Sequence, residues 1–379
     1  MDLQVKLKQS RVLFILIMIM VIDLLLGACS NDQAHSKPAT KDRTKTNTVA
    51  KSSDDWKLPI TVPQGNFFKI GGWFSDRQLV YITNLDQTST VYVYNISTGK
   101  SDLLYKSENP IATVQISPSR KYLLIQSSPS TYQANVTIID LKGTEILKKS
   151  FPSYELACEW NVFDETKLLV SIFNQDWTYK MVLFDLNNAH EAEVSLPQPF
   201  IKWIGKEKIA YLNWNKNNPE LFAPVIEKNL RDEKEKTIIP LAIYFSAFQD
   251  FLLSITVNEH DSSKAAYSFY DNDQKRIYTF SIPQLTNYSD WLVPFYDYSE
   301  SKKQFYTFRP LASGEADSYS KGFELVVYDL QNKNEKLIME GMKNEPISLS
   351  PSGEACLYGN NLEKMIDLKT KKVYQLIKG

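Results

Sequence analysis

The sequence predicts an all-β fold, a β-propeller, that follows an export signal and a polar tether. Aromatic residues make up 12 % of the 379 residues and glycine contributes only 13, a composition that favours sheets. A strand–turn–strand pattern recurs along the chain about every 45 residues, which matches the period of a propeller blade. Lysine and arginine number 43 against 44 aspartate and glutamate, and this near-neutral charge argues against a nucleic-acid partner.

Residues 1–28 are typical of a secretory signal peptide. A basic start over residues 1–11 precedes an apolar run over residues 12–22, and small residues follow near the predicted cleavage site. The sequence Leu26-Gly27-Ala28-Cys29 resembles the bacterial lipobox, in which a branched residue and two small residues precede an invariant cysteine. This resemblance implies that the Cys29 thiol carries a diacylglyceryl group that inserts into the lipid bilayer. The predicted location is therefore the cell membrane, lipid-anchored and facing the extracytoplasmic side.

An uncleaved membrane anchor over residues 12–28 is the alternative. Its 17 residues are at the short end for a hydrocarbon core of about 30 Å. It also contains Asp23, and an aspartate costs roughly 2.5–3.5 kcal/mol at the centre of a spanning helix.

A tether is expected over residues 29–55. From Ser30 to Asp55 the chain has no aromatic residue and one large aliphatic residue, Val49, so it lacks the apolar surface that folding requires. A flexible chain of this length reaches roughly 28 Å. The predicted domains are the signal peptide over 1–28, the lipidated cysteine and disordered tether over 29–55, and the propeller over 56–379.

The propeller is expected to have seven four-stranded blades. Each repeat has an apolar strand, an Asn or Asp, a short polar turn and a second strand, and two further strands precede most of these hairpins. The Asn or Asp side chain is expected to cap the turn by accepting backbone N–H groups. These residues are Asn95, Asp140, Asp185, Asn229, Asp271, Asp329 and Asp367. Closure of the ring is expected to bring Trp56–Val62 close to Lys372–Ile377.

Six blades with an inserted segment are the alternative architecture. Apolar residues between Pro219 and Leu230 have near-helical spacing, which is compatible with an inserted helix. Pro224 lies within that stretch and argues against an unbroken helix.

Two turns carry a resemblance to known propellers. The segments 116–123 and 349–356 resemble the S-P-D-G-K turn of TolB-type, WD-like repeats, with Ser in place of the family Asp in both. Arg120 replaces the glycine in the first of them. The whole chain, lipobox and divergent propeller together, resembles the uncharacterised YqgU-like lipoproteins of Bacillus relatives. That resemblance implies a lipid-anchored propeller and supplies no activity.

Residues with the chemistry of a metal or catalytic site are few. The three histidines, His35, His190 and His260, are separated by whole repeats, so no metal site or cofactor is expected. Cys158 and Cys356 are expected to be buried thiols, with a disulfide between them as the alternative. No nucleophile elbow, phosphate-binding loop or dinucleotide fingerprint occurs.

The candidate binding face lies on the loops between the second and third strands of the blades. These loops are expected to be long and uneven, and several place an aromatic residue beside Asn or Asp, a composition that suits protein contacts and sugar stacking. The candidate residues are Tyr132, Asp176, Trp177, Trp214, Asn215 and Arg309.

The sequence thus favours a non-catalytic scaffold that binds a protein partner of the cell envelope. A carbohydrate or small-ligand sensor is the second hypothesis. A hydrolase or lyase acting on glycan or peptide is the third, and it needs a convergent pair of carboxylates in the central channel.

Overall fold

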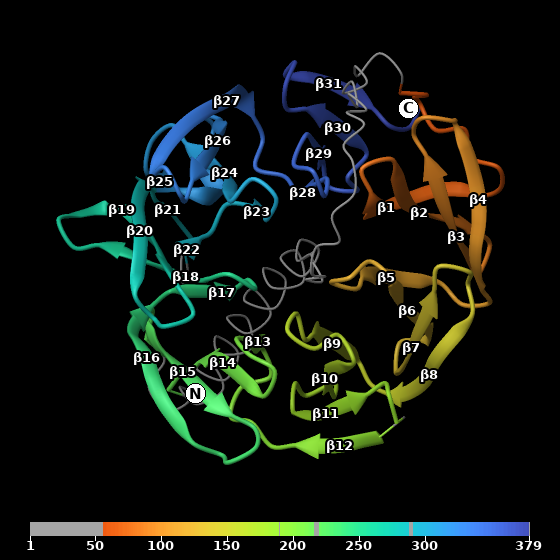
Figure 1. Cartoon of the computed structure of the whole chain (residues 1–379), viewed down its shortest axis with the longest axis horizontal. Coiled ribbons are helices and arrows are strands. Elements are labelled where there is room, and N and C mark those ends of the chain that lie inside the picture. The colour runs from red at the N-terminus through yellow and green to blue at the C-terminus, as the bar shows by residue number, and fades with distance from the viewer. Residues whose placement is uncertain (1–55, 189, 216–219, 288–290, 379) are drawn as a thin grey trace, which may run out of the picture.

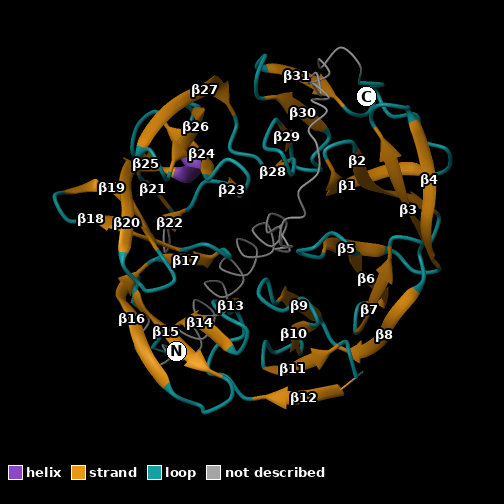
Figure 2. Ribbon diagram, in the orientation of Figure 1, coloured by secondary structure: helices purple, strands orange, loops and turns teal. Residues whose placement is uncertain are grey.

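The computed structural model describes residues 56–188, 190–215, 220–287 and 291–378. The predicted signal peptide, Cys29 and the tether lie outside the described residues. The described chain forms seven four-stranded antiparallel sheets arranged around a centre, as Figures 1 and 2 show. The prediction of an all-β propeller fold is therefore confirmed.

Consecutive strands of the chain build each four-stranded sheet, and we number the sheets one to seven in chain order. Sheet one comprises β1 (Asn66–Ser75), β2 (Gln78–Leu85), β3 (Thr88–Asn95) and β4 (Lys100–Ser107). Sheet two comprises β5 (Ile111–Ile116), β6 (Tyr122–Ser130), β7 (Gln133–Asp140) and β8 (Glu145–Pro152). Sheet three comprises β9 (Glu155–Trp160), β10 (Lys167–Phe173), β11 (Tyr179–Asp185) and β12 (His190–Val194). Sheet four comprises β13 (Lys202–Trp203), β14 (Lys208–Leu212), β15 (Ala223–Asn229) and β16 (Glu235–Ala242).

The remaining sheets follow the same order, with one small sheet added. Sheet five comprises β17 (Tyr244–Ala247), β18 (Leu252–Asn258), β19 (Asp261–Tyr270) and β20 (Arg276–Pro283). Sheet six comprises β23 (Tyr296–Ser299), β24 (Gln304–Pro310), β26 (Phe323–Asp329) and β27 (Asn334–Met342). Sheet seven comprises β28 (Ile347–Leu349), β29 (Ala355–Tyr358), β30 (Lys364–Asp367) and β31 (Lys372–Gln375). The small sheet joins β21 (Leu285–Thr286), β22 (Trp291–Leu292) and β25 (Gly314–Glu315).

The helix considered for residues 219–230 is wrong. Strand β15 occupies Ala223–Asn229, and its residues Val225 and Ile226 are buried between β14 and β16. Such β-branched side chains suit a pleated strand, and Pro224 lacks the N–H that a helix interior needs. Within the described residues the helical structure is a 3₁₀ turn at Ala316–Ser318 (η2). The described part of the chain has no helix long and apolar enough to cross a membrane.

The hydrophobic core lies between neighbouring sheets. Leu124 and Ile138 of sheet two form one buried cluster with Trp160 of sheet three. Between sheets five and six, Phe280 stacks on Tyr328 with ring centroids 3.5 Å apart. Alternate residues of each strand thus fill the space between two sheets, so every sheet depends on its neighbours for burial.

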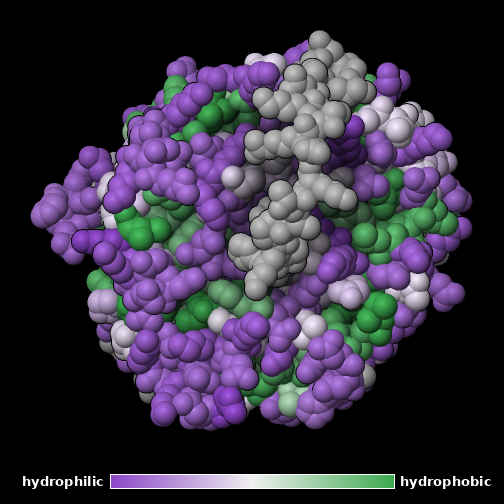
Figure 3. All heavy atoms as spheres, viewed as in Figure 1, coloured by the Kyte–Doolittle hydropathy of each residue, from purple (hydrophilic) through white to green (hydrophobic). Residues whose placement is uncertain are grey.

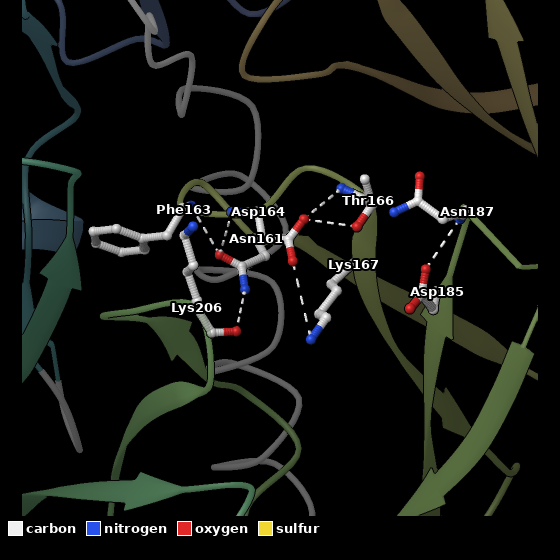
Figure 4. A network of polar contacts seen from close by, with 8 residues as sticks. All are labelled: Asn161, Phe163, Asp164, Thr166, Lys167, Asp185, Asn187 and Lys206. Carbon is white, nitrogen blue, oxygen red and sulfur yellow. Dashed lines mark hydrogen bonds and ion pairs between the residues drawn. The ribbon is translucent and has the colours of Figure 1, made fainter.

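All seven predicted Asn and Asp caps are confirmed. Each side chain accepts hydrogen bonds from backbone N–H groups two to four residues further along, as Figure 4 shows for Asp185 and Asn187. The seven residues are Asn95, Asp140, Asp185, Asn229, Asp271, Asp329 and Asp367. The repeat therefore follows from a local hydrogen-bond preference of Asx side chains.

The two turns that resemble TolB-type repeats have the same local geometry. Ser117 Oγ accepts the N–H of Tyr122 at 3.1 Å, and Ser350 Oγ accepts the N–H of Ala355 at 3.2 Å. Arg120 and Gly353 both adopt the left-handed conformation, with φ of 60° and 66°. Arg120 thus occupies a position that favours glycine.

The ring closes between the two ends of the described chain, as predicted. The N–H of Ile60 donates to the carbonyl of Leu376 at 2.7 Å, and the ring of Trp56 meets that of Tyr374 edge-on at 5.3 Å. Ile60 is buried in the cluster that joins sheets one and seven. The segment before β1 therefore fastens onto the last strand.

A polar contact also joins every neighbouring pair of the seven sheets. Figure 4 shows one example, in which Asn161 Nδ2 donates to the carbonyl of Lys206 at 3.1 Å across sheets three and four. The other pairs, in ring order, are Tyr105–Glu145, Ser119–Glu165, Glu227–Gln274, Asp250–Lys303, Lys302–Gly353 and Asp76–Ser352. Together with the apolar clusters, these contacts hold the loops on a rigid frame.

Candidate functional site

The two ends of the ring differ in the connections they carry. Because the four strands of each sheet alternate in direction, the first-to-second and third-to-fourth turns lie at one end, the turn end. The second-to-third loops and the links between sheets lie at the other end, the loop end. All the candidate binding residues except Arg309 lie in connections of the loop end.

Two of the loops expected to be long are tight turns. Strands β6 and β7 leave only residues 131–132 between them, and β18 and β19 leave only 259–260. Continued pairing of the strands shortens both connections. The connection between β24 and β26, over residues 311–322, is long and contains β25 and η2.

Tyr132 and Trp177 lie close to a third aromatic residue, Tyr154, at the loop end. The ring of Trp177 meets Tyr154 at 5.7 Å and the buried Phe173 at 6.0 Å, both edge-on. The N–H of Ser153, the neighbour of Tyr154, donates to the carbonyl of Tyr132. Tyr132 is 60 % exposed and Tyr154 is 42 % exposed. We call Tyr132, Tyr154 and Trp177 the aromatic patch.

Asp176 shapes the turn that presents Trp177. Its carboxylate accepts hydrogen bonds from the backbone N–H and the hydroxyl of Thr178, at 3.1 and 2.7 Å. Trp177 has a φ of 65°, a left-handed conformation that is uncommon for a bulky residue. The turn therefore holds the indole in one direction, against Tyr154 and Phe173.

Trp214 and Asn215 lie at the loop end of sheet four, in the connection between β14 and β15. Trp214 is half-buried, and its carbonyl accepts a hydrogen bond from Gln198 Nε2 at 3.4 Å. Gln198 lies in the link before β13, and this link also carries Phe200, which stacks on Phe173 at 5.6 Å. Asn215 is exposed next to Trp214. The link thus connects Trp214 with the aromatic patch.

Arg309 has a different position from the one expected. It lies in strand β24, which continues to Pro310, rather than in a loop. Its guanidinium forms ion pairs with Glu324 at 2.7 Å and Glu335 at 2.9 Å, on the two next strands of sheet six. This geometry is a cross-strand network within one sheet.

A second apolar pair at the loop end was not predicted. Phe222, which precedes β15, contacts Trp291 of β22 with ring centroids 6.1 Å apart, and Leu221 is 46 % exposed. The local sequence shows only that two apolar residues, Leu221 and Phe222, precede Ala223. Their contact with Trp291 depends on a strand more than sixty residues further along the chain. On the face displayed in Figure 3, hydrophobic side chains form separate patches between polar areas.

The inner strands border a small, partly open cavity that is lined by an ion pair. The cavity has a volume of about 50 Å³, and its lining includes Gln115 of β5, Glu159 of β9, Lys202 of β13 and Ser348 of β28. Lys202 Nζ lies 3.1 and 2.9 Å from the two carboxylate oxygens of Glu159. Burial raises the pKa of Glu159, while the Lys202 ammonium opposes that rise. Among the described residues that line the cavity, Glu159 and Lys202 are the only charged ones.

Two buried tryptophans fix the inner strands beside this cavity. Trp203 Nε1 donates to the carbonyl of Glu159 at 3.2 Å, which ties β13 to β9. Trp73 Nε1 donates to the carbonyl of Ser348 at 3.0 Å, which ties β1 to β28. The backbone at Glu159 is therefore held by the indole of Trp203, the residue that follows Lys202.

Asp297 is a second buried carboxylate of the inner strands. It accepts hydrogen bonds from the N–H groups of Tyr298 at 2.8 Å and Leu349 at 2.6 Å. Burial raises its pKa to about 7, and these two hydrogen bonds limit the rise. The sequence analysis assigned no role to Glu159 or Asp297, although Glu159 precedes Trp160 and Asp297 lies between two tyrosines.

Two cysteines are buried and two histidines are exposed in the described part of the chain. Cys158 and Cys356 are free, buried thiols, so the disulfide alternative is wrong. Burial raises the pKa of Cys158 to about 12, which keeps it a neutral thiol. His190 and His260 are exposed. In the described ranges no three His, Cys, Asp or Glu side chains are grouped to hold a metal ion.

Comparisons with known proteins relate most of the propeller to one family. The model of the domain described as "YqgU-like 6-bladed beta propeller domain" matches residues 95–359. The uncharacterized lipoprotein YqgU of Bacillus subtilis is 25 % identical over 366 residues, which cover 97 % of each chain. The crystal structure of the uncharacterized protein lmo1340 from Listeria monocytogenes has a TM-score of 0.77 at 25 % identity, over 85 % of this chain and 97 % of that one. An oligogalacturonate lyase shares the fold alone, with a TM-score of 0.54 and 10 % identity over 80 % and 94 % of the two chains.

Proposed function

The chain belongs to the family of YqgU-like six-bladed β-propeller domains, and on this premise we propose that it is a membrane-anchored envelope lipoprotein whose propeller is a non-catalytic scaffold for a protein partner. The aromatic patch is the observation that carries the proposal. It places three large side chains at the loop end of a ring whose sheets are tied together on every side.

Anchoring through Cys29 is supported by the lipobox resemblance of residues 26–29 and by the full-length relative, which is named a lipoprotein. A diacylglyceryl group on Cys29 holds the propeller on the extracytoplasmic side of the cell membrane in this proposal. Residues 30–55 then separate the anchor from the propeller in this proposal.

The blade number of this chain is proposed to be seven. The family description names six blades, and its model spans residues 95–359. That span holds sheets two to six whole, together with parts of sheets one and seven. Seven four-stranded sheets and the contact of Ile60 with Leu376 favour a ring of seven in this chain.

The aromatic patch has the features of a protein-binding hot spot. Tyrosine and tryptophan supply large contact areas at low cost in side-chain entropy, and they dominate the energetics of many interfaces. Trp177 is fixed by Phe173 and Tyr154 and by the turn that Asp176 caps. A partner that covers Tyr132 and Tyr154 therefore meets a preformed surface.

The inner carboxylates favour a scaffold over an acid–base enzyme. Lys202 binds both oxygens of Glu159, and two backbone N–H groups bind the oxygens of Asp297. General acid–base catalysis requires carboxyl groups that exchange protons with a substrate. These carboxylates are engaged in holding neighbouring strands together.

The test compares partner binding by full-length variants in detergent extracts of the envelope. Trp177→Ala combined with Tyr154→Ala is expected to weaken the recovered partner complex at least tenfold, because both changes remove hot-spot area. Leu103→Ala combined with Val373→Ala is the matched control, because these exposed residues lie on the outer strands β4 and β31. Equal recovery of the same partner by the patch variant and the wild type would refute the proposal.

A further inference from the structure

The Glu159–Lys202 pair is a largely buried ion pair that joins two inner strands, β9 and β13. The side chains are 18 % and 20 % exposed, so both charges have lost most of their hydration. The desolvation cost of such a pair commonly equals or exceeds its attraction, and well-packed apolar residues often replace it without loss of stability. The inner strands already have a separate connection at this point, since Trp203 donates to the carbonyl of Glu159.

The pair faces open space, and polar groups of two other strands border the same space. The cavity of about 50 Å³ is lined by the two charges, by Gln115 and Ser348, and by apolar residues such as Val114 and Trp160. A water molecule needs roughly 10–15 Å³ of such volume, so the cavity has room for about four waters or a ligand of similar size. Glycine and alanine have five and six non-hydrogen atoms.

We propose that this cavity binds a small zwitterion of the amino acid class, whose carboxylate pairs with Lys202 and whose ammonium pairs with Glu159. The ligand inserts between two charges that pair with each other in its absence. Each charge exchanges one partner for another, so the cavity stays neutral overall. Gln115, whose Nε2 donates to the carbonyl of Cys158 at 3.4 Å and whose amide oxygen is an acceptor, and Ser348 border the same cavity and supply the additional hydrogen bonds in this proposal.

The same geometry rejects ligands with a single charge. Acetate would pair with Lys202 and leave Glu159 without its cation, and methylammonium would leave Lys202 without its anion. A buried charge without a partner is strongly unfavourable. Burial also raises the pKa of Tyr244 and of Tyr296, the latter to about 12, and the negative charge of Glu159 adds to both rises.

The first measurement uses the wild-type, full-length protein in detergent and isothermal titration with glycine, alanine, acetate and methylammonium. Glycine or alanine is expected to bind at least tenfold more tightly than either singly charged probe. Equal affinities for all four probes, or no heat from glycine and alanine up to tens of millimolar, would overturn the proposal. This measurement needs no variant and is independent of the aromatic patch.

The second measurement uses variants of the pair. Lys202→Met and Glu159→Gln are each expected to weaken glycine binding at least tenfold, whereas the exchanged pair Glu159→Lys with Lys202→Glu retains it within about fivefold. Glu345→Gln is the matched control, because Glu345 pairs with Lys364 at 3.3 Å with similar exposure in sheet seven. Unchanged glycine affinity in both single variants places the ligand elsewhere and overturns the assignment. The assignment is also overturned if Glu345→Gln weakens glycine binding as much as the single variants of the pair do.

Discussion

Asp297 accepts the N–H of Leu349 at 2.6 Å and thereby joins β23 to β28, the inner strands of sheets six and seven. Its other oxygen accepts the N–H of Tyr298. The two N–H groups thus bind different oxygens of one carboxylate, and burial penalises the negative charge that makes both oxygens strong acceptors. This joint between two sheets is therefore sensitive to protonation.

The stability that Asp297 contributes is expected to fall as the pH rises from about 4 to about 7. Burial raises its folded pKa from 3.8 to about 7, so the folded chain binds more protons than the unfolded chain in that window. The contribution is thus fully present below the unfolded pKa and is lost as the pH passes through the folded pKa. The difference in unfolding free energy between wild type and Asp297→Asn is expected to fall by about 4 kcal/mol over this range.

Urea titration followed by tryptophan fluorescence at pH 4, 5.5, 7 and 8 measures this difference. Exposed carboxylates titrate in both proteins, so their effect cancels when the unfolding free energy of the variant is subtracted from that of the wild type. A constant difference across the four pH values contradicts the assignment to Asp297.

Gly353→Ala is expected to destabilise the fold by about 2–4 kcal/mol through two separate effects. Gly353 has a φ of 66°, and an added Cβ would lie 2.3 Å from Ser299 Oγ of the neighbouring sheet. Gly341→Ala separates the two effects, because Gly341 has a φ of 67° and nothing within 4 Å of the added Cβ. The control should lose only about 1 kcal/mol. Equal losses in thermal denaturation would show that contact with Ser299 adds nothing.

The turns were predictable from the sequence because their hydrogen bonds are local. Asn229 lies in a divergent hairpin, yet its side chain accepts the N–H of Arg231, two residues further along. The cap depends on the Asx side chain and the next few residues alone. A period set by such turns therefore identifies the repeat even where the strands diverge.

The central cavity was not predictable in the same way. Glu159 and Lys202 lie on different sheets, and only the packing of one sheet on the next brings them together. The near-helical spacing of apolar residues over 219–230 was misleading for a similar reason. The strand there is decided by pairing with β14 and β16, which spacing within the segment does not show. The available signal was a charged residue directly before a tryptophan, at Glu159 before Trp160 and at Lys202 before Trp203.

Cys29→Ala is expected to abolish incorporation of labelled fatty acid into the protein. The thiol is the attachment point in the lipobox resemblance, and alanine offers no nucleophile. The variant should also leave the membrane fraction or keep its leader, which fractionation and mass spectrometry of the N-terminus measure. Cys158→Ala and Cys356→Ala are controls, because both thiols are buried in the propeller. Continued labelling of the Cys29 variant would refute lipid anchoring at this residue.

Arg309→Met is expected to lower stability without changing partner recovery. The guanidinium pairs with Glu324, which is 16 % exposed, and with Glu335. Methionine keeps the apolar stem but leaves the carboxylate of Glu324 without its cation, which costs about 1–3 kcal/mol. Arg309→Lys should recover only part of this loss, because an ammonium cannot reproduce the planar contacts with two carboxylates. Chemical denaturation measures the stability, and the envelope pull-down used for the aromatic patch measures partner binding. The opposite result, in which Arg309→Met is as stable as the wild type but no longer recovers the partner, would contradict this prediction. Arg309 would then belong to the binding face.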